Sequence, residues 1–471
     1  MLLAGCDKFL DINKSPNDPS AATPQLVLPS GIASSAYVIG GWYQLLGGMW
    51  AQHWAQSTGS GQWTDWEDYA LRGDHYDVYQ YGMLYSGVLN DMEYIRKETM
   101  RTKDWTYYLI ATCIQSYTFQ VLADLYDKIP FTEALKGTDN LTPKWDDGQL
   151  VYDSLIARLD FAVNKDFTIK SATSPLATSS QVGNEDLIFQ GDIDSWVQFA
   201  NMLKLKLFLR QVYVRPNIAQ AGIAELFSAN NFLMRDAAMT TFSNEQDKRN
   251  PIYETGVDRL AGNIAASATL LEYLKSSADP RLNRIFSPAV ANGLMVGIQN
   301  GHYKSDAAIF PNIQYLSTPN LGPVDPVYFF SRAECFFMLA EANLRYGSTS
   351  DAEAFYILGI QSSMEKLGVT VDTALYSPGG PYEYPATGFE DQLRAIIVQK
   401  WIAAANSQSL EAFFDQNRTG YPDFLVISPT NVTGGKFPKR LIFPESETKS
   451  NPNTPAIVPI YTKVWWDTKV K

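Results

Sequence analysis

Long apolar segments with helical spacing constrain the fold of this chain more than any other feature of its sequence. From Asp104 to Tyr126 apolar residues occur almost all round a helix, which predicts a helix that its neighbours cover on several sides. A second helical pattern runs from about Tyr328 to Tyr346 and ends at Gly347, and a third runs from Asp351 to Lys366. The last two are predicted to form one helical hairpin, in which Gly359 allows close approach of the partner helix.

The composition is typical of a compact protein. Of the 471 residues, 45% are hydrophobic and 19% are charged, and the charged share lies below the roughly 25% of an average soluble chain. Helical hairpins of about 40 residues resemble tetratricopeptide units in their geometry, although the strict consensus of that repeat is absent. We therefore expect a mostly α fold, with hairpins within about residues 30–230 and 325–405.

Charge and motif content exclude several classes of protein. The chain has 38 basic and 50 acidic residues, a formal net charge of −12, so it offers no general basic surface to nucleic acid. Its three histidines (His53, His75 and His302) and its three cysteines lack the spacing of zinc or haem motifs. Nucleotide-binding and nucleophile-elbow motifs are also absent. We predict no catalytic residue, no metal site and no cofactor.

The first residues indicate a membrane anchor. Leu3-Ala4-Gly5-Cys6 resembles the bacterial lipobox at the end of a signal peptide, in which the cysteine is lipidated. The residues after Cys6 are polar and proline-rich, as in a tether, so residues 1–24 are predicted to be a lipobox-like start and tether. No run of 18 apolar residues occurs elsewhere. We expect a protein that lies on a membrane through its acyl chains and does not span it.

Long segments without a helical pattern separate the hairpins. Insertions of this length inside a compact protein are usually functional surfaces, so we expect ligand binding there. The insertions are residues 56–77, 170–191, 232–262, 288–326 and the tail, 420–471.

Several further segments occur in the order in which a known family carries them. They are Leu122–Leu135, Pro143–Asp147, Trp196–Leu203, Asn250-Pro251, Asp279–Leu282, Arg332–Ala342, Gln399–Ile402, Arg418–Asp423 and Pro438–Pro444. Together they resemble the SusD/RagB family of outer-membrane nutrient-binding lipoproteins, and the last blocks are similar to its SusD-like subgroup. The resemblance spans nearly the whole chain.

The resemblance implies a single SusD-like domain over residues 25–471, with about four tetratricopeptide-like helix pairs and a loop-rich ligand-binding side. It also implies a lipid-anchored protein that faces outward from the outer membrane. Such a protein captures an oligosaccharide and acts as the lid of a SusC-like TonB-dependent barrel. Chemistry on the ligand belongs to other proteins, so we do not expect an enzyme.

The residues themselves suggest where a sugar could bind. A sugar has an apolar C–H face and a rim of hydroxyls, so its site needs uncovered aromatic rings beside polar groups. Small residues at 57–61 precede two tryptophans and are expected to leave their rings uncovered, as in an early loop of the family's starch-binding members. For each tryptophan the alternative is a core or loop-anchoring role. The predicted ligand-binding residues are Trp63, Trp66, Asp68, Tyr69, Tyr76, Tyr303 and Tyr315.

Other notable residues are predicted to be structural. Trp401 and the tryptophans at 465 and 466 are expected to pack in the body of the protein. Arg281 and Arg418 are expected to hold carboxylates inside the fold, and Cys113 and Cys335 to be buried thiols.

Two alternative functions stay open. The same scaffold could bind peptides, as the RagB branch implies, and a deep cavity flanked by charges in place of an open aromatic arc would favour that reading. The chain could instead be an all-helical glycoside hydrolase, which would need two carboxylates about 5 Å or roughly 6.5–9.5 Å apart in a cleft.

Overall fold

The computed structural model describes residues 22–470, and Cys6 with most of the predicted tether lies outside them. Within this range the protein is mostly α, as predicted. The helices are α1 (Pro24–Val38), α2 (Gln44–Trp50), α3 (Thr64–Glu67), α4 (Asn90–Thr102), α5 (Trp105–Tyr126), α6 (Gly148–Val163), α7 (Ile193–Arg210), α8 (Pro216–Ala229), α9 (Ala268–Ser276), α10 (Leu282–Ile285), α11 (Arg332–Tyr346), α12 (Thr349–Lys366), α13 (Phe389–Ala404), α14 (Ser409–Thr419) and α15 (Glu445–Ser450).

The strands are short and pair in twos, all antiparallel. They are β1 (Trp54–Gln56) with β5 (Ile264–Ala266), β2 (Lys128–Pro130) with β3 (Trp145–Asp147), β4 (Ala237–Met239) with β8 (Val327–Phe330), and β6 (Phe286–Ser287) with β7 (Thr318–Pro319). In the first pair Gln56 lies opposite Ile264, so the start of the first predicted insertion is fixed to a segment about 200 residues later.

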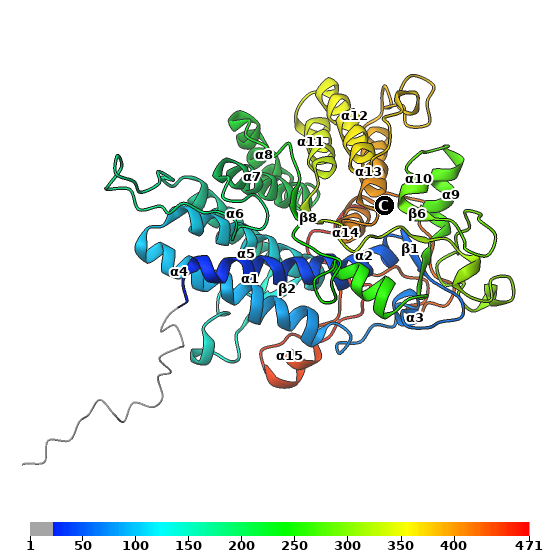
Figure 1. Ribbon diagram of the computed structural model, residues 1–471, viewed down its shortest axis with the longest axis horizontal. Coiled ribbons are helices and arrows are strands. Elements are labelled where there is room, and N and C mark those ends of the chain that lie inside the picture. Colours follow the sequence, from blue (N-terminus) through cyan, green and yellow to red (C-terminus); the bar gives the residue numbers. More distant parts are fainter. Residues whose placement is uncertain (1–21, 471) are drawn as a thin grey trace, which may run out of the picture.

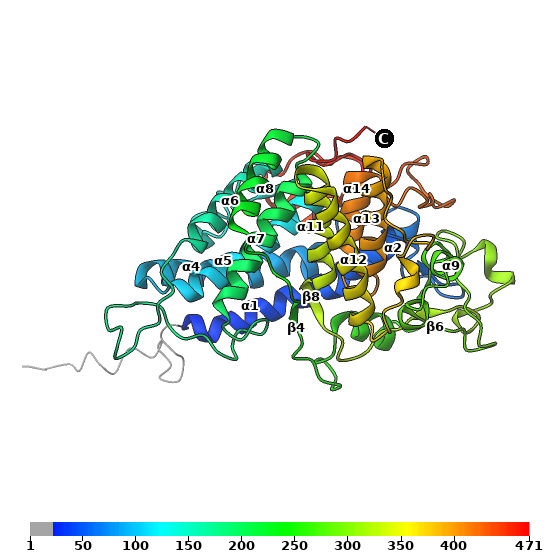
Figure 2. The same ribbon diagram turned by 90° about the horizontal axis from the view of Figure 1, so that it is seen from above.

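The molecule divides along its length into a helical part and a loop-rich end. In Figures 1 and 2, α1 and α4–α8 occupy one half, α11–α14 follow, and the loops around α3, α9 and β6 form the other end. Consecutive helices pack against each other, notably α4 with α5, α7 with α8, α11 with α12 and α13 with α14. This pairing of neighbours is the tetratricopeptide-like arrangement that the periodicity predicts.

The sequence explains the main helices. All but one residue of α5 is buried, as its apolar pattern predicts. The helix predicted from Tyr328 begins four residues later, because Val327–Phe330 is strand β8 and the side chain of Ser331 accepts a hydrogen bond from the Glu334 amide to cap α11. A Cβ atom at Gly359 would lie 2.6 Å from Cε1 of Phe337, so α12 requires glycine where it crosses α11.

Buried ion pairs join five helices: α5, α7, α11, α13 and α14. Arg210 of α7 pairs with Asp124 of α5 and with Glu411 and Asp415 of α14. Arg418 of α14 pairs with Glu341 of α11 at 2.5 Å. Lys400 of α13 pairs with Asp415 at 2.8 Å, and Lys206 of α7 with Glu334 of α11 at 2.9 Å. We call these groups the core ion-pair network. The prediction that Arg418 holds a carboxylate inside the fold is confirmed, as is that for Arg281, which pairs with Asp279 at 2.7 Å.

The remaining structural predictions also hold. Trp401 and Trp466 are buried and Trp465 is half-buried against the core. Cys113 and Cys335 are buried free thiols. Across residues 22–470 no helix is long and apolar enough to cross a membrane.

Candidate functional site

Four of the predicted insertions meet at the loop-rich end. Residues 57–62 contact residues 262–263, where the amide of Ser57 donates to the carbonyl of Asn263 at 2.9 Å. The hydroxyl of Thr58 donates to the carbonyl of Phe310. The amide of Val432 donates to the carbonyl of Asp68 at 2.8 Å, which joins the C-terminal insertion to the first. The insertions therefore form one surface, as the prediction of a loop-rich side requires.

The expectation that Trp63 and Trp66 present uncovered rings is wrong. Trp63 is 2% exposed and Trp66 is 4% exposed. Their ring centroids are 4.8 Å apart, and Trp42 covers Trp63 edge-on at 5.3 Å. Tyr76, 2% exposed, packs on Trp66 at 5.3 Å. Burying apolar ring surface in one cluster is favourable, so these rings stabilise the loop and offer no free face to a sugar.

Backbone contacts hold this segment inward. The amide of Trp63 donates to Oε1 of Gln56 at 2.7 Å, and Nε1 of Trp50 donates to the carbonyl of Trp66 at 3.1 Å. Trp66 lies on the single turn of α3, which follows the small residues at 57–61. These small residues let loops pack closely. A Cβ at Gly59 would lie 3.0 Å from the carbonyl oxygen of Pro311.

A buried carboxyl fastens the first insertion to the later one. Glu67 accepts from the amides of Gln56 at 2.7 Å and Gly301 at 2.6 Å, and from the side chain of Asn300 at 3.1 Å. Burial raises the pKa of Glu67 to about 8, against the effect of these donors. Because Glu67 is 2% exposed and both of its oxygens accept hydrogen bonds within the protein, its role is to hold the two insertions together.

Asp68, Tyr69 and Tyr303 are also engaged internally. The hydroxyl of Tyr303 donates to Asp68 at 2.8 Å, and the hydroxyl of Thr430 donates to the same carboxylate. The hydroxyl of Tyr69 accepts from the amide of Ser428 at 3.2 Å. Tyr69 is 5% exposed and Tyr303 is 4% exposed, so the expectation that these rings are open to a ligand is wrong as well. They join three of the insertions to one another.

Tyr315 differs from the other six predicted residues because its ring is 39% exposed. It ends a short 3-10 helix, Ile313–Tyr315, whose first turn is capped by the side chain of Asn312 accepting from the amide of Gln314 at 3.0 Å. In the part of the chain that the structure describes, the Tyr315 side chain makes no hydrogen bond or ring contact. Part of this side chain is therefore open to solvent.

Exposed amide side chains belong to the segments that lie against this 3-10 helix. We call the surface the Tyr315 face. The carbonyl of Gln314 accepts from the amide of Ala291 at 2.9 Å, and a Cβ at Gly262 would contact Ile313 at 3.6 Å, so the neighbouring loops lie against the 3-10 helix. The exposed amide residues on these segments are Gln62, Asn292, Asn312 and Gln314. Amides both donate and accept hydrogen bonds, which suits hydroxyl groups of a neutral ligand.

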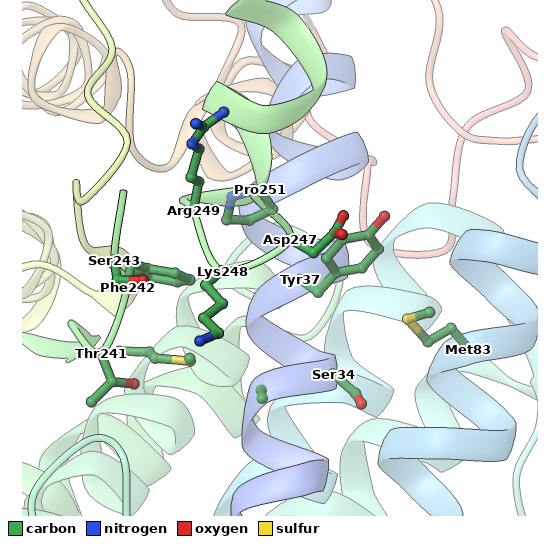
Figure 3. A pocket seen from close by; sticks show the side chains of 12 residues that line it. Ser34, Tyr37, Met83, Thr241, Phe242, Ser243, Asp247, Lys248, Arg249 and Pro251 are labelled. Atoms are coloured by element: carbon green, nitrogen blue, oxygen red, sulfur yellow. The ribbon is translucent and has the colours of Figure 1, made fainter. Parts of the chain in front are cut away.

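Sequence reasoning missed a cavity of about 430 Å³ between α1 and residues 239–251. Figure 3 shows Tyr37 of α1 beside Asp247 and Ser34 of α1 pointing toward Met83, with Phe242 and Lys248 on the other side of the helix in this view. Met83, Met239 and Pro251 add apolar surface. The insertion 232–262 was predicted, but no motif singled out its residues, and Tyr37 belongs to a helix whose apolar pattern indicates only packing.

Comparison with known proteins identifies a family and several solved structures with this architecture. A family model described as starch-binding and associating with the outer membrane, SusD-like, matches residues 16–444. A chitin-binding SusD homologue from Flavobacterium johnsoniae superposes with a TM-score of 0.79 at 23% identity, covering 94% of this chain and 99% of that one. A SusD homologue from Bacteroides uniformis gives 0.75 at 24% identity over 94% and 99% of the two chains. One from Bacteroides fragilis gives 0.75 at 22% identity over 96% and 100%. No curated protein matches the chain.

Proposed function

The chain belongs to the SusD-like family, and we propose that it is a non-catalytic cell-surface protein that captures oligosaccharides. Family membership supports a glycan ligand, and the chitin-binding homologue with the same fold supports it further. The observation that carries the proposal is the exposed, unengaged ring of Tyr315 among four exposed amide residues.

The chemistry of the Tyr315 face fits capture and release. The phenol ring can stack on the C–H face of a sugar, and the amides can bind the hydroxyls at its edge. If the ring contributes on the order of 1 kcal/mol and several hydrogen bonds contribute about as much each, the dissociation constant falls roughly between millimolar and micromolar. A ligand held this weakly can be passed on to a transporter.

Family membership also supports a proposal for the cellular location and the partner of the protein. We place it on the outer membrane, facing outward and anchored through a lipid on Cys6, with a SusC-like TonB-dependent barrel as its partner. In this arrangement the protein is the lid that closes a bound oligosaccharide over the barrel. Nucleic acid is not a partner in this proposal, since the net charge is −12.

A binding panel tests the glycan proposal. Chitin and starch oligosaccharides, with other plant and microbial glycans, are titrated into the protein by calorimetry. We expect saturable binding of at least one glycan and a loss of about tenfold in affinity for Tyr315→Ala, since one stacked ring is removed. Tyr79→Ala is the matched control, because Tyr79 is 67% exposed on another surface. Equal effects of the two substitutions would exclude the Tyr315 face as the site.

The same panel tests the absence of catalysis. The proteins and glycans are incubated overnight and assayed for new reducing ends. We expect none, and turnover that a single carboxylate substitution abolishes would replace the binding proposal with a glycoside hydrolase.

Peptide capture is a second candidate because of the cavity in Figure 3. Its lining is largely apolar, and charges stand at its edge on Asp247, Lys248 and Arg249. An apolar peptide side chain would fit the floor while the backbone meets the charges. A peptide library screened against the protein and against Tyr37→Ala and Phe242→Ala tests this candidate, and binding of glycans but of no peptide would reject it.

A further inference from the structure

A smaller cavity, of about 280 Å³, lies beside the end of α12. One wall is formed by Lys366, the last residue of α12, and by Ala405–Ser407 after α13. The rest of the lining comes from Arg284 of α10 and from residues 320–328, which follow β7 and enter β8. We call it the α12 cavity. It shares no lining residue with the Tyr315 face or with the cavity in Figure 3.

Two positive groups in the α12 cavity have no counter-ion. In residues 22–470 neither Lys366 nor Arg284 has a carboxylate within ion-pair distance, although acidic residues outnumber basic ones in the whole chain by 50 to 38. The one acidic residue in the lining is Asp325, whose carboxylate already accepts from the amide of Gly322 at 2.6 Å. The lining therefore carries two positive charges against one negative charge.

The cations also have unused donors. The ammonium of Lys366 donates to the carbonyl of Ala403 and to Oγ of Ser407, both at 2.7 Å, which leaves its third N–H free. The guanidinium of Arg284 donates to no other described residue, so its planar set of five N–H groups is available. An ammonium held away from bulk water without a counter-ion is costly, and a bound anion would remove that cost.

We infer that the α12 cavity binds the carboxylate of a small hydroxy acid, such as one uronic acid unit, with Lys366 and Arg284 as its ligands. A carboxylate has two oxygens in a plane, which match a guanidinium fork and leave room for one ammonium N–H. The second oxygen of Asp325 and the side-chain carbonyl of Asn320 are acceptors for hydroxyls of the same ligand.

The cavity volume limits the ligand to about one ring. Pockets for drug-sized ligands span about 300–1,000 Å³, and this one lies just below that range. The carboxylate could come from a sugar acid within a glycan or from a free organic acid, and both share the recognition chemistry. The inference holds whether or not the Tyr315 face binds sugar, since the two surfaces are built from different residues.

The charge of Lys366 should couple binding to pH. Burial lowers the pKa of the Lys366 ammonium to about 8, with Asp236 and Glu334 acting against this and Arg281 adding to it. Tyr328, whose ring lies 5.2 Å from the ammonium, has a pKa raised by burial and stays neutral in this range. Burial also raises the pKa of Asp325, against the hydrogen bond from the amide of Gly322. If only the charged lysine binds, affinity falls about tenfold between pH 7 and pH 9.

The test is a titration of the whole protein with glucuronate, galacturonate, acetate and glucose at pH 7 and pH 9. We expect both uronates to bind at pH 7 and glucose not to bind the α12 cavity. Lys366→Met and Arg284→Gln should each weaken uronate binding at least tenfold, and the pH effect should disappear in Lys366→Met. Arg284 is exposed, so its variant keeps the test valid if Lys366→Met unfolds.

Two controls separate the possible outcomes. Lys170→Met removes another exposed lysine without an ion pair and should leave uronate affinity within twofold. Tyr315→Ala should also leave it unchanged, so failure of the glycan proposal and failure of this one are distinguishable. Acetate binding as tightly as uronate would identify free carboxylic acids as the ligand class. Uronates binding no better than glucose, or equally well to Arg284→Gln, would overturn the inference.

Discussion

At the scale of single residues, burial decides which aromatic rings can serve a ligand. The sequence places Trp63 and Trp66 among small polar residues, a pattern that favours exposure in a loop. The fold brings Trp42 against both rings, and that contact depends on a helix 20 residues earlier, which local spacing cannot reveal. Tyr315, by contrast, is exposed because Ile313, the first residue of its 3-10 helix, is the one that packs against the small hydrophobic cluster around Leu316.

Trp63→Ala is expected to be a stability variant and not a binding variant. Removing a buried indole leaves a cavity in the aromatic cluster and should lower the free energy of unfolding by about 3–5 kcal/mol. Urea denaturation measures this, with Tyr79→Ala expected to change stability by less than about 0.5 kcal/mol. Unchanged stability together with lost glycan binding would restore the tryptophan to the ligand site.

Charged residues were easier to predict than aromatic ones. Arg281 follows Asp279 by two residues, so a local turn accounts for their pairing, and the sequence interpretation was right. Lys366 and Arg284 lie 82 positions apart, and only the folded chain shows that both line one cavity without a counter-ion.

At the scale of helices and strands, periodicity predicted most of the structure. The bounds of α5 and α12 agree with the apolar pattern to within two residues. The start of α11 did not follow the pattern, because residues with strand-like character at 327–330 pair with β4, a partner about 90 residues earlier. Short strands of this kind depend on a distant partner, so the sequence pattern alone does not identify them.

The core ion-pair network predicts how acid weakens the packing between helices. Burial alone would raise the pKa of Glu341, but Arg418 and Arg345 outweigh it and hold the pKa at about 2. A carboxyl with a lowered folded-state pKa stabilises the fold above its ordinary pKa near 4.5, and this stability is lost as pH falls toward 2.

For Glu341 alone the loss between pH 6 and pH 3 is about 2 kcal/mol. Urea denaturation at the two pH values measures it. Glu341→Gln should be less stable than the natural protein at pH 6 and should lose less stability on acidification. An equal loss in both proteins would contradict the assigned role of this pair.

At the scale of the whole molecule, the order of the family-like blocks predicted the architecture, while the meeting of the insertions emerges only in three dimensions. Residues 57–69, 262–315 and 428–432 are joined by Glu67, Asp68 and Tyr303. None of these contacts has a sequence pattern, since each joins segments at least 190 residues apart.

The proposed lipid anchor on Cys6 is tested by substituting this residue in the protein as the cell makes it. Cys6→Ser removes the lipidated thiol and should move the protein from the membrane fraction to the soluble fraction, because acyl chains supply about 0.8 kcal/mol per buried methylene. Fractionation followed by immunoblotting measures the shift. Retention of Cys6→Ser in the membrane fraction would show that another contact holds the protein there.

The pairing of β1 with β5, and of Asp68 with Val432, also determines the order in which parts of the newly made chain can fold. Strand β1 must wait for more than 200 further residues before its partner exists, and Asp68 must wait for more than 360. Such distant contacts form slowly, so the loop-rich end is completed last, after nearly all of the chain has been synthesised. Until these contacts form, Trp63 and Trp66 remain exposed to solvent. This end is therefore the part of the newly made chain with the greatest need of a chaperone.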